Sequence, residues 1–415
     1  MKRSLGEWLA FIEQQHPQPT ALGLERVQQV LSRMQLQLPS PVITVGGTNG
    51  KGSTCAMLES ILRSAGYRTG LYTSPHLVSY NERVRIAGVD AGDDALCAGF
   101  EAVEQVREGV ALTYFEFGTL AAFHAFSNAA LDALILEVGL GGRLDAVNAV
   151  DPDCAILTSV GIDHVDYLGP DRESIGREKA GIFRPYRPAV IAEPDPPHAV
   201  RGAVGNKLYL GKDFGYELQG GQWAYWGAKG KRAGLAHPAL RGGIQLRNAA
   251  AVLCALDALE LPVAMQEIRR GLAEVTLAGR FQVLPGRPQV ILDVAHNVEA
   301  ARNLADNLAD SGFAPETIAV CGMLRDKDIA GVLHALAPRI TRWHLASLEG
   351  PRAASADDLA HHLEGPVFKH ESPRAALAAA LERAGEGDKI VVFGSFFTVG
   401  EAMSWLKKNN KTSKR

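Results

Sequence analysis

The sequence predicts an α/β protein of two domains, each built on a mostly parallel β-sheet. Three observations predict this class. After residue 289, apolar runs of strand length alternate with segments of helical spacing. The first 270 residues alternate less regularly, around a buried strand and a glycine-rich turn. Between these parts, Gly279, Pro285, Gly286 and Pro288 interrupt both periodicities. We expect a first domain at 1–279, a linker at 280–288, a second, smaller domain at 289–409 and a polar tail at 410–415.

The expected elements follow in order along the chain. In the first domain, helices at 5–15 and 22–34 precede a strand at 42–45, a helix at 51–65 and strands ending at 72, 138 and 158. Peripheral hairpins are expected at 208–230 and a closing helix at 245–259. In the second domain, helices fill the gaps between strands at 289–294, 317–321, 341–346, 366–370 and 389–393.

The composition limits the kind of partner. Lys and Arg number 43 against 46 Asp and Glu, which gives a formal charge of -3 and a pI near 6.5. This balance argues against a chain that coats nucleic acid or an anionic membrane. The five cysteines form no C-x-x-C pair, and no apolar run approaches the ~18 residues of a membrane span. We therefore expect a cytoplasmic protein whose partners are small molecules.

The strongest local signal is a glycine-rich turn that links a buried strand to a helix. It reads Gly46-Gly47-Thr48-Asn49-Gly50-Lys51-Gly52-Ser53-Thr54. Glycines permit positive φ, the helix N-terminus adds partial positive charge, Lys51 can reach outer phosphates and a hydroxyl can ligate Mg²⁺. The turn departs from the generic G-x-x-x-x-G-K-[ST] form at Val45 and Gly52. It predicts a phosphate-binding turn, the alternative being a glycine turn that binds no ligand.

Charged residues at other strand ends allow two interpretations each. Glu137 ends an apolar strand, where a carboxylate requires a cation or a salt bridge with Arg143. His164 follows the next strand and is either a ligand or a hydrogen-bonded turn residue. Lys179 alone would be a surface lysine. The glycines from Gly139 to Gly142 lack the other features of a dinucleotide fingerprint, so we do not interpret them as one.

The second domain offers complementary groups at the end of its first strand. Asp293 and His296 follow that strand, and Arg280 lies in the expected linker. One domain then supplies phosphate donors and the other an acid, a histidine and an arginine. A nucleotide between the two domains is the simplest interpretation.

Several segments together resemble a known family. They include Thr48–Ser53, Thr73–Leu77, Glu137–Asn148, Gly161–His164, Arg177–Phe183, Leu246–Ala249, Gly279–Phe281 and Asp293–Asn297. In this order they resemble the folylpolyglutamate synthases of the Mur ligase superfamily, and most closely the bacterial bifunctional dihydrofolate synthase/folylpolyglutamate synthases. The family carries T-N-G-K-G-[ST] in its phosphate loop, and the resemblance implies a P-loop-type ATPase domain followed by a Rossmann-like domain.

The resemblance also implies ligand sites, position by position. ATP would contact Thr48, Asn49, Gly50, Lys51, Gly52, Ser53, Thr54 and Asn248 and, across the cleft, Arg280, Asp293 and His296. Two Mg²⁺ ions would be held by Ser53, Ser74, Glu137, His164 and Lys179. Lys179 falls where the family has a lysine carbamylated by CO₂. The histidine ligand makes Mn²⁺ an alternative, and a monovalent cation is a further expected cofactor. Lys51, Lys179, His164 and Glu137 would act in catalysis.

The implied substrates are dihydropteroate or a reduced folate, L-glutamate and ATP, joined through an acyl phosphate by a monomeric ligase. The pteridine substrate would contact Thr113, Tyr114, Phe115, Glu116, Leu144, Asp145 and Ala146. Tyr114 and Phe115 can stack on a flat heterocycle, and Asp145 can accept from an amino-pyrimidine edge. The alternatives are a folylpolyglutamate synthase alone, a cell-wall Mur-type amino-acid ligase, a P-loop kinase and a nucleotide-binding regulatory module without turnover.

Overall fold

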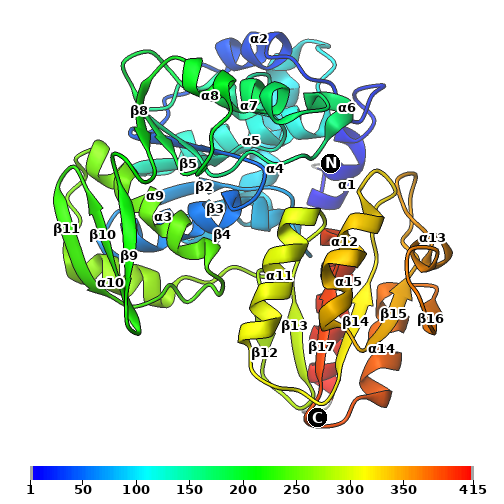
Figure 1. Ribbon diagram of the computed structural model, residues 1–415. Coiled ribbons are helices and arrows are strands. Elements are labelled where there is room, and N and C mark those ends of the chain that lie inside the picture. Colours follow the sequence, from blue (N-terminus) through cyan, green and yellow to red (C-terminus); the bar gives the residue numbers. More distant parts are fainter. Residues whose placement is uncertain (1–2, 413–415) are drawn as a thin grey trace. The chain divides into compact units, whose positions relative to one another are not determined.

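The computed structural model describes residues 3–412 and divides into two compact units. Unit 1 comprises residues 3–76, 80–239 and 245–275, and unit 2 comprises residues 77–79, 240–244 and 276–412 (Figure 1). The expected linker at 280–288 therefore lies inside unit 2.

Unit 1 is built on an eight-stranded sheet in the order β4-β3-β2-β5-β1-β6-β7-β8. Strands β2, β5, β1, β6, β7 and β8 are mutually parallel, whereas β3 and β4 run antiparallel at one edge. The strands are β1 Val42–Gly46, β2 Thr69–Tyr72, β3 Val84–Ile86, β4 Val89–Asp90, β5 Ala133–Glu137, β6 Cys154–Leu157, β7 Pro188–Ile191 and β8 Asn206–Tyr209. The carboxyl ends of β2, β5, β1 and β6 thus lie along one edge of the sheet.

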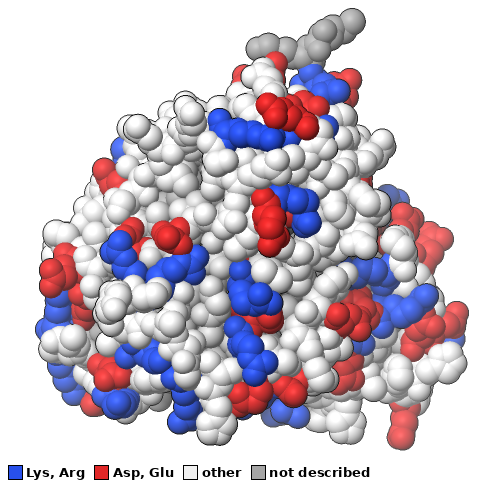
Figure 2. All heavy atoms as spheres, turned by 90° about the horizontal axis from the view of Figure 1, so that it is seen from above, with Lys and Arg blue, Asp and Glu red and all other residues white. Residues whose placement is uncertain are grey.

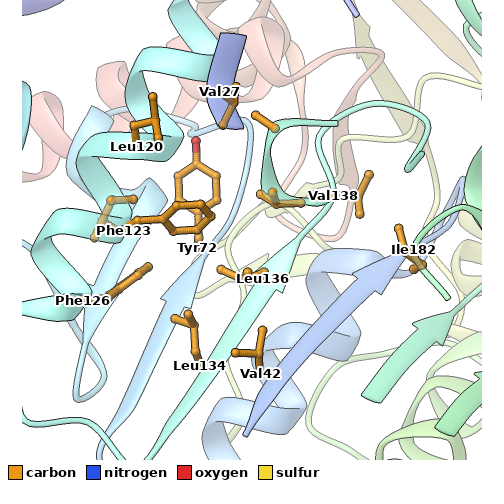
Figure 3. Close-up of a cluster of buried hydrophobic side chains, with 14 of the residues drawn as sticks. Val27, Val42, Tyr72, Leu120, Phe123, Phe126, Leu134, Leu136, Val138 and Ile182 are labelled. Atoms are coloured by element: carbon orange, nitrogen blue, oxygen red, sulfur yellow. The ribbon is translucent and has the colours of Figure 1, made fainter. Parts of the chain in front are cut away.

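Helices and short 3₁₀ turns connect these strands. They are α1 Leu5–Ile12, α2 Glu25–Met34, α3 Lys51–Ser64, η1 Tyr80–Arg83, α4 Asp93–Arg107, α5 Tyr114–Ser127, η2 Ala146–Ala149, α6 Val165–Leu168, α7 Arg172–Ala180, α8 His198–Gly202, α9 Ile244–Ala258 and α10 Met265–Glu274. Side chains of α2 and α5 pack on one face of the sheet, against Leu134 and Leu136 of β5 and Tyr72 of β2 (Figure 3). On α3, the Ser60 hydroxyl donates to the Gly271 carbonyl of α10 at 2.7 Å.

A separate three-stranded antiparallel sheet in unit 1 corresponds to the expected hairpins. It consists of β9 Gly215–Gln219, β10 Gln222–Gly227 and β11 Gly230–Leu235. On β10, Tyr225 donates to the Asp257 carboxylate of α9 at 2.9 Å, and Arg232 of β11 also pairs with it. These contacts fix the small sheet on α9.

Unit 2 has a six-stranded sheet in the order β12-β13-β17-β14-β15-β16, parallel except for β12. The strands are β12 Gln282–Leu284, β13 Gln289–Leu292, β14 Thr317–Cys321, β15 Arg342–Ala346, β16 Val367–His370 and β17 Lys389–Phe393. The remaining elements are α11 Val298–Asp310, α12 Ile329–Leu336, η3 Ala337–Arg339, α13 Ala356–Ala360, α14 Pro373–Arg383 and α15 Phe396–Thr412.

The alternation of side chains along these strands makes a three-layered unit. Ile291 and Val391 pack with α11, α12 and α13, whereas Val290, Leu292 and Ile390 pack with α14 and α15. Because neighbouring strand residues point to opposite faces, strands that are apolar throughout can be covered on both sides.

Two boundaries differ from the sequence expectation. Part of the expected linker forms β12, whose pairing with β13 extends the sheet. The expected tail at 410–415 overlaps α15, which continues to Thr412, and its last three residues, 413–415, lie outside the described residues.

Three further features of the described residues concern helix hydropathy, surface charge and the cysteines. No helix within residues 3–412 is both long and apolar enough to cross a membrane. On the face drawn in Figure 2, Lys and Arg side chains are interspersed with Asp and Glu. All five cysteines are unpaired, and four of them are buried.

Candidate functional site

The phosphate loop lies between β1 and α3, as the sequence predicts. Gly47 and Gly50 have φ of 148° and 89°, conformations that other residues rarely adopt. A Cβ atom at Gly50 would lie 2.9 Å from Asn248 Oδ1, and one at Gly47 would lie 1.9 Å from Thr158 Oγ1. Glycine is therefore required at both positions by backbone conformation and by space.

Two hydroxyl residues that follow β6 hold this loop in place. Thr158 Oγ1 donates to the Asn49 carbonyl at 2.7 Å, and Ser159 Oγ accepts from the Asn49 N–H at 2.9 Å. The Thr48 N–H in turn donates to the Ser159 carbonyl at 2.9 Å. Neither hydroxyl belongs to a motif that marks it in the sequence, although both follow a strand that ends at the predicted edge.

Two lysines converge on one carbonyl of the loop. Lys51 Nζ and Lys179 Nζ each donate to the Gly47 carbonyl oxygen at 3.0 Å, and Lys51 also donates to the Thr48 carbonyl at 3.2 Å. Lys179 comes from α7 and is only 4% exposed. The interpretation of Lys179 as a surface lysine is therefore wrong.

Burial changes the chemistry of Lys179. It lowers the pKa of the amine to about 7, and the positive charge of Lys51 acts in the same direction. The carboxylates of Asp163 and Asp145 oppose this shift. A lysine with such a pKa carries a substantial neutral fraction near pH 7, and neutral amines are nucleophilic.

Glu137 ends β5 beside the loop. It pairs in register with Val45 of β1, is 4% exposed, and its Oε2 accepts from the Ser74 N–H at 3.2 Å. Arg143 pairs with Glu178 at 2.9 Å. The alternative salt bridge between Arg143 and Glu137 is therefore not formed, because Arg143 pairs with Glu178.

His164 lies beyond the end of β6, in a left-handed conformation with φ of 53° that begins α6. Its N–H donates to Asp163 Oδ1 at 2.8 Å, and its Nε2 lies 4.0 Å from Asp163 Oδ2. The Thr48 hydroxyl donates to the Gly161 carbonyl and accepts from the Gly161 N–H. These two bonds tie the start of this segment to the phosphate loop.

Two buried oxygens beside the loop suit a nucleotide. Asn248 Oδ1 and Thr54 Oγ1 are buried and have no hydrogen-bond partner within residues 3–412. Asn248 donates to Gln245 at 3.1 Å and faces Gly50 with its unsatisfied oxygen. Buried polar atoms without partners are costly, so a ligand donor at this position would stabilise the site. Ser53 is also buried in the first turn of α3.

The candidate metal ligands form an open set. In the described part of the chain, no three His, Cys, Asp or Glu side chains are grouped so that they could hold an ion. Mg²⁺ usually combines one or two carboxylates with water and substrate phosphates. Glu137 and the Ser74 segment, next to a phosphate loop, fit a metal that arrives with a nucleotide.

Two of the expected substrate residues cap a helix. Thr113 caps α5 by accepting from the Glu116 N–H at 3.2 Å, while Glu116 accepts from the Thr113 N–H at 2.8 Å. The buried Glu116 also pairs with Arg26 at 2.7 Å. These contacts fix the first turn of α5, from which Tyr114 and Phe115 project.

The other substrate candidates lie between α5 and the loop after β5. Phe115 packs on Gly139 and lies 6.0 Å from the Tyr72 ring. Asp145 is buried and accepts from the N–H groups of Leu140 and Val147; burial raises the pKa of its carboxyl to about 6. Leu144 accepts from Gly23 at 3.4 Å, and Ala146 begins η2.

Unit 2 gathers its own three candidates. Asp293 accepts from the N–H groups of Phe281 and Ala295, each at 2.8 Å. Burial raises the pKa of its carboxyl, and Arg280 opposes that shift. The Arg280 guanidinium and the His296 ring lie 5.3 and 6.2 Å from the Phe396 ring. Arg280, Asp293 and His296 are therefore close together within this unit.

Comparison with known proteins gives the family. Residues 45–256 match the Mur ligase middle domain and residues 279–396 match the Mur ligase, glutamate ligase domain. The dihydrofolate synthase/folylpolyglutamate synthase of Escherichia coli K12 is 46% identical over 96% of this chain and 94% of its own. The chain belongs to the dihydrofolate synthase/folylpolyglutamate synthase family of Mur ligases. The resemblance inferred from the motifs is thus confirmed, as is the α/β class with two mostly parallel sheets.

Solved structures of this family share the whole fold. An Escherichia coli structure in complex with DHPP and ADP has a TM-score of 0.95 and 44% identity, over 98% of this chain and 99% of its own. A bifunctional folylpolyglutamate synthase/dihydrofolate synthase with Mn, AMPPNP and L-glutamate bound has a TM-score of 0.92 and 45% identity, over 98% of each chain.

Proposed function

We propose that this protein is an ATP-dependent ligase that adds L-glutamate to dihydropteroate, forming dihydrofolate, and to reduced folates, forming folylpolyglutamates. The observation that carries the proposal is the convergence of Lys51, Lys179 and Glu137 on one phosphate-type loop. Relatives that bind ADP, AMPPNP, Mn or L-glutamate support the same chemistry.

The reaction begins with binding of ATP at the loop. The N–H groups at the start of α3 and the Lys51 ammonium would surround the outer phosphates. The Thr54 hydroxyl would donate to a phosphate oxygen, and the Asn248 oxygen would accept from a hydroxyl or amino group of the nucleoside. A carboxylate oxygen of the pterin substrate then attacks the γ-phosphorus, giving an acyl phosphate and ADP. The amine of glutamate attacks the acyl carbon, phosphate leaves, and the amine gives up a proton. Lys51 stabilises the negative charge that develops in each step.

Divalent metal would be held by Glu137, Ser74, Ser53 and His164. When bound, Mg²⁺ or Mn²⁺ would neutralise phosphate charge and orient the γ-phosphate. Glu137 is suited to this role because it is buried, and a buried carboxylate favours a nearby cation.

Lys179 would complete the site as a carbamate. Its neutral Nζ attacks the carbon of CO₂ and loses a proton, which converts a cationic side chain into an anionic oxygen ligand. The low pKa of Lys179 favours the reactive neutral amine, and the change of charge removes the repulsion between Lys179 and Lys51.

The pterin substrate would occupy the surface of unit 1 near Tyr114, Phe115 and Asp145. Aromatic rings can stack on the heterocycle, and the Asp145 carboxylate can accept from its amino group. Arg280, Asp293 and His296 are proposed nucleotide contacts from unit 2. We expect a monomer that acts in the cytoplasm.

The test supplies purified protein with ATP, Mg²⁺ and labelled glutamate, together with dihydropteroate or tetrahydrofolate. The proposal predicts glutamate incorporation with both acceptors. Incorporation with tetrahydrofolate alone would leave a folylpolyglutamate synthase. ADP release without glutamate would indicate a kinase, and absence of any turnover would indicate a regulatory module.

A further inference from the structure

Arg83 carries a positive charge that the chemistry described above does not use. It ends η1 in unit 1 and is partly buried. Its guanidinium lies 5.3 Å from the ring of Tyr80 and 5.6 Å from that of Tyr114. The two rings form an edge-to-face pair 6.0 Å apart, and the guanidinium lies beside both of them, which holds the arginine in a defined position.

The hydrogen bonds of Arg83 leave most of its donors available. Its Nε donates to His76 Nδ1 at 2.9 Å. Within residues 3–412, no Asp or Glu carboxylate forms an ion pair with Arg83, and neither Nη group has a hydrogen-bond acceptor.

The other arginines near this edge differ in that respect. Arg26 is paired with Glu116, and Arg85 is paired with Glu59 at 2.9 Å. A partly buried guanidinium usually has a carboxylate or carbonyl partner, because five donors in a fixed fork are costly to leave unsatisfied. The geometry at Arg83 is therefore that of a site for an anion from outside the chain.

Backbone contacts place Arg83 close to the reacting centre. The Thr73 N–H donates to the Arg83 carbonyl at 2.9 Å. The next residue along, Ser74, donates its N–H to Glu137. Tyr114, whose ring Arg83 faces, precedes Phe115 at the expected pterin site. The Arg83 backbone is thus bonded next to the Ser74 segment, and its guanidinium lies beside Tyr114 of the expected pterin site.

The two acceptor substrates differ in one way that matters here. Dihydropteroate has a single carboxyl group, which is the one that reacts. A reduced folate ends in a glutamyl residue with two carboxylates, of which one reacts and the other stays free a few bonds away. Planar bidentate pairing with an arginine is the favoured way to bind such a group.

We propose that Arg83 binds the non-reacting carboxylate of the terminal glutamyl residue of folate substrates, and so determines specificity for the folate-extending activity. This inference rests on the proposed function. The predicted effect is selective, since dihydropteroate has no second carboxylate for Arg83 to bind.

The experiment compares Arg83→Leu with the wild type in both activities, using dihydropteroate and tetrahydrofolate as acceptors at saturating ATP and glutamate. The KM for tetrahydrofolate should rise at least about tenfold more than the KM for dihydropteroate, because a hydrogen bond to a charged group contributes about 1.5–3 kcal/mol. Arg83→Lys, which keeps the charge but loses the fork, should show a smaller rise of the same selectivity.

A matched control removes an arginine at the amino end of β2, the end of that strand away from Ser74. Arg68 precedes β2, is exposed, and donates to the Ala130 carbonyl. Arg68→Leu should change neither KM selectively. Calorimetric titration of each variant with tetrahydrofolate and with dihydropteroate, without ATP, gives the same comparison independently of turnover.

Three outcomes would overturn the proposal: equal changes for both acceptors, no change for either, or a rise in the KM for glutamate in both activities. The last outcome would assign Arg83 to the incoming amino acid. Wild-type protein without either activity would instead contradict the proposed function, whereas the binding comparison would still decide the role of Arg83.

Discussion

At the scale of single residues, Lys179 gives the most specific chemical prediction. In protein equilibrated with ¹³C-bicarbonate, a carbamate carbon signal should appear and should be absent in Lys179→Ala. The same variant should lose nearly all turnover while keeping ATP binding, because Lys51 and the loop remain. Carbon NMR and nucleotide titration measure the two effects.

Lys389 provides the control for that experiment. It is also buried and donates to the carbonyls of Ser311 and Gly312, but it lies in unit 2, away from any phosphate loop. Lys389→Met should keep the carbamate signal. Wild-type turnover in Lys179→Ala would contradict the proposed role of the carbamate.

Site residues could be predicted from the sequence where a charged side chain stands in an unusual local context. Glu137 in an apolar strand and Lys51 between glycines are conspicuous because burial of charge is costly. Arg83, Thr158 and Ser159 gave no such signal, since their roles depend on contacts between segments far apart in the sequence. Glu116 was expected at the substrate site; it caps α5 together with Thr113, and it also pairs with Arg26, ninety residues away.

At the scale of elements, the phosphate loop makes a prediction about backbone and space together. Gly50→Ala should weaken ATP binding by an order of magnitude or more, because its Cβ would meet Asn248 at 2.9 Å in a left-handed conformation. Titration with a non-hydrolysable ATP analogue measures the loss.

A substitution at Gly66 separates the effect of backbone strain from the effect of steric crowding. It has the same φ of 89° at the end of α3, but nothing lies within 4 Å of its Cβ position. Gly66→Ala should therefore destabilise the fold by about 1 kcal/mol through backbone strain alone and leave ATP affinity intact. Equal ATP affinities in the two variants would refute the crowding argument.

A second prediction for an element concerns β15 and β16 of unit 2. His344 is fully buried, stacks on His370, and their ring nitrogens lie 3.0 Å apart. Burial lowers the pKa of His344 to about 4, and His370, Arg383 and Arg342 reinforce the shift. The unfolded chain then binds more protons below pH 6.5, so stability should fall between pH 6.5 and 4.

The expected loss is up to about 3 kcal/mol. Hydrogen exchange of the β15 amides, corrected for intrinsic rates, measures it, and His344→Phe should flatten the dependence. A wild-type profile unchanged down to pH 4 would contradict the assignment.

Element types could be predicted from the sequence better than element boundaries. Apolar runs of four or five residues between helical segments identify parallel strands, and β14 and β17 have the expected bounds. The strand β12 was missed because Gly279 precedes it and Pro285, Gly286 and Pro288 follow it, a pattern that suggests a linker. Its position is determined by pairing with β13, which the local sequence does not encode.

At the scale of the whole molecule, the chain forms two α/β units that carry different candidate residues. Unit 1 holds the phosphate loop, the two lysines and the acidic strand end. Unit 2 contributes an arginine, an acid and a histidine near Phe396. Family membership links both units to one reaction, in which an activated carboxyl must survive until an amine arrives.

The transfer of oxygen tests this central claim most directly. Dihydropteroate labelled with ¹⁸O in its carboxyl group is turned over with ATP, Mg²⁺ and glutamate, and the released phosphate is analysed by mass spectrometry. An acyl phosphate requires one ¹⁸O atom in each phosphate formed. Unlabelled phosphate, accompanied by formation of dihydrofolate, would contradict the account.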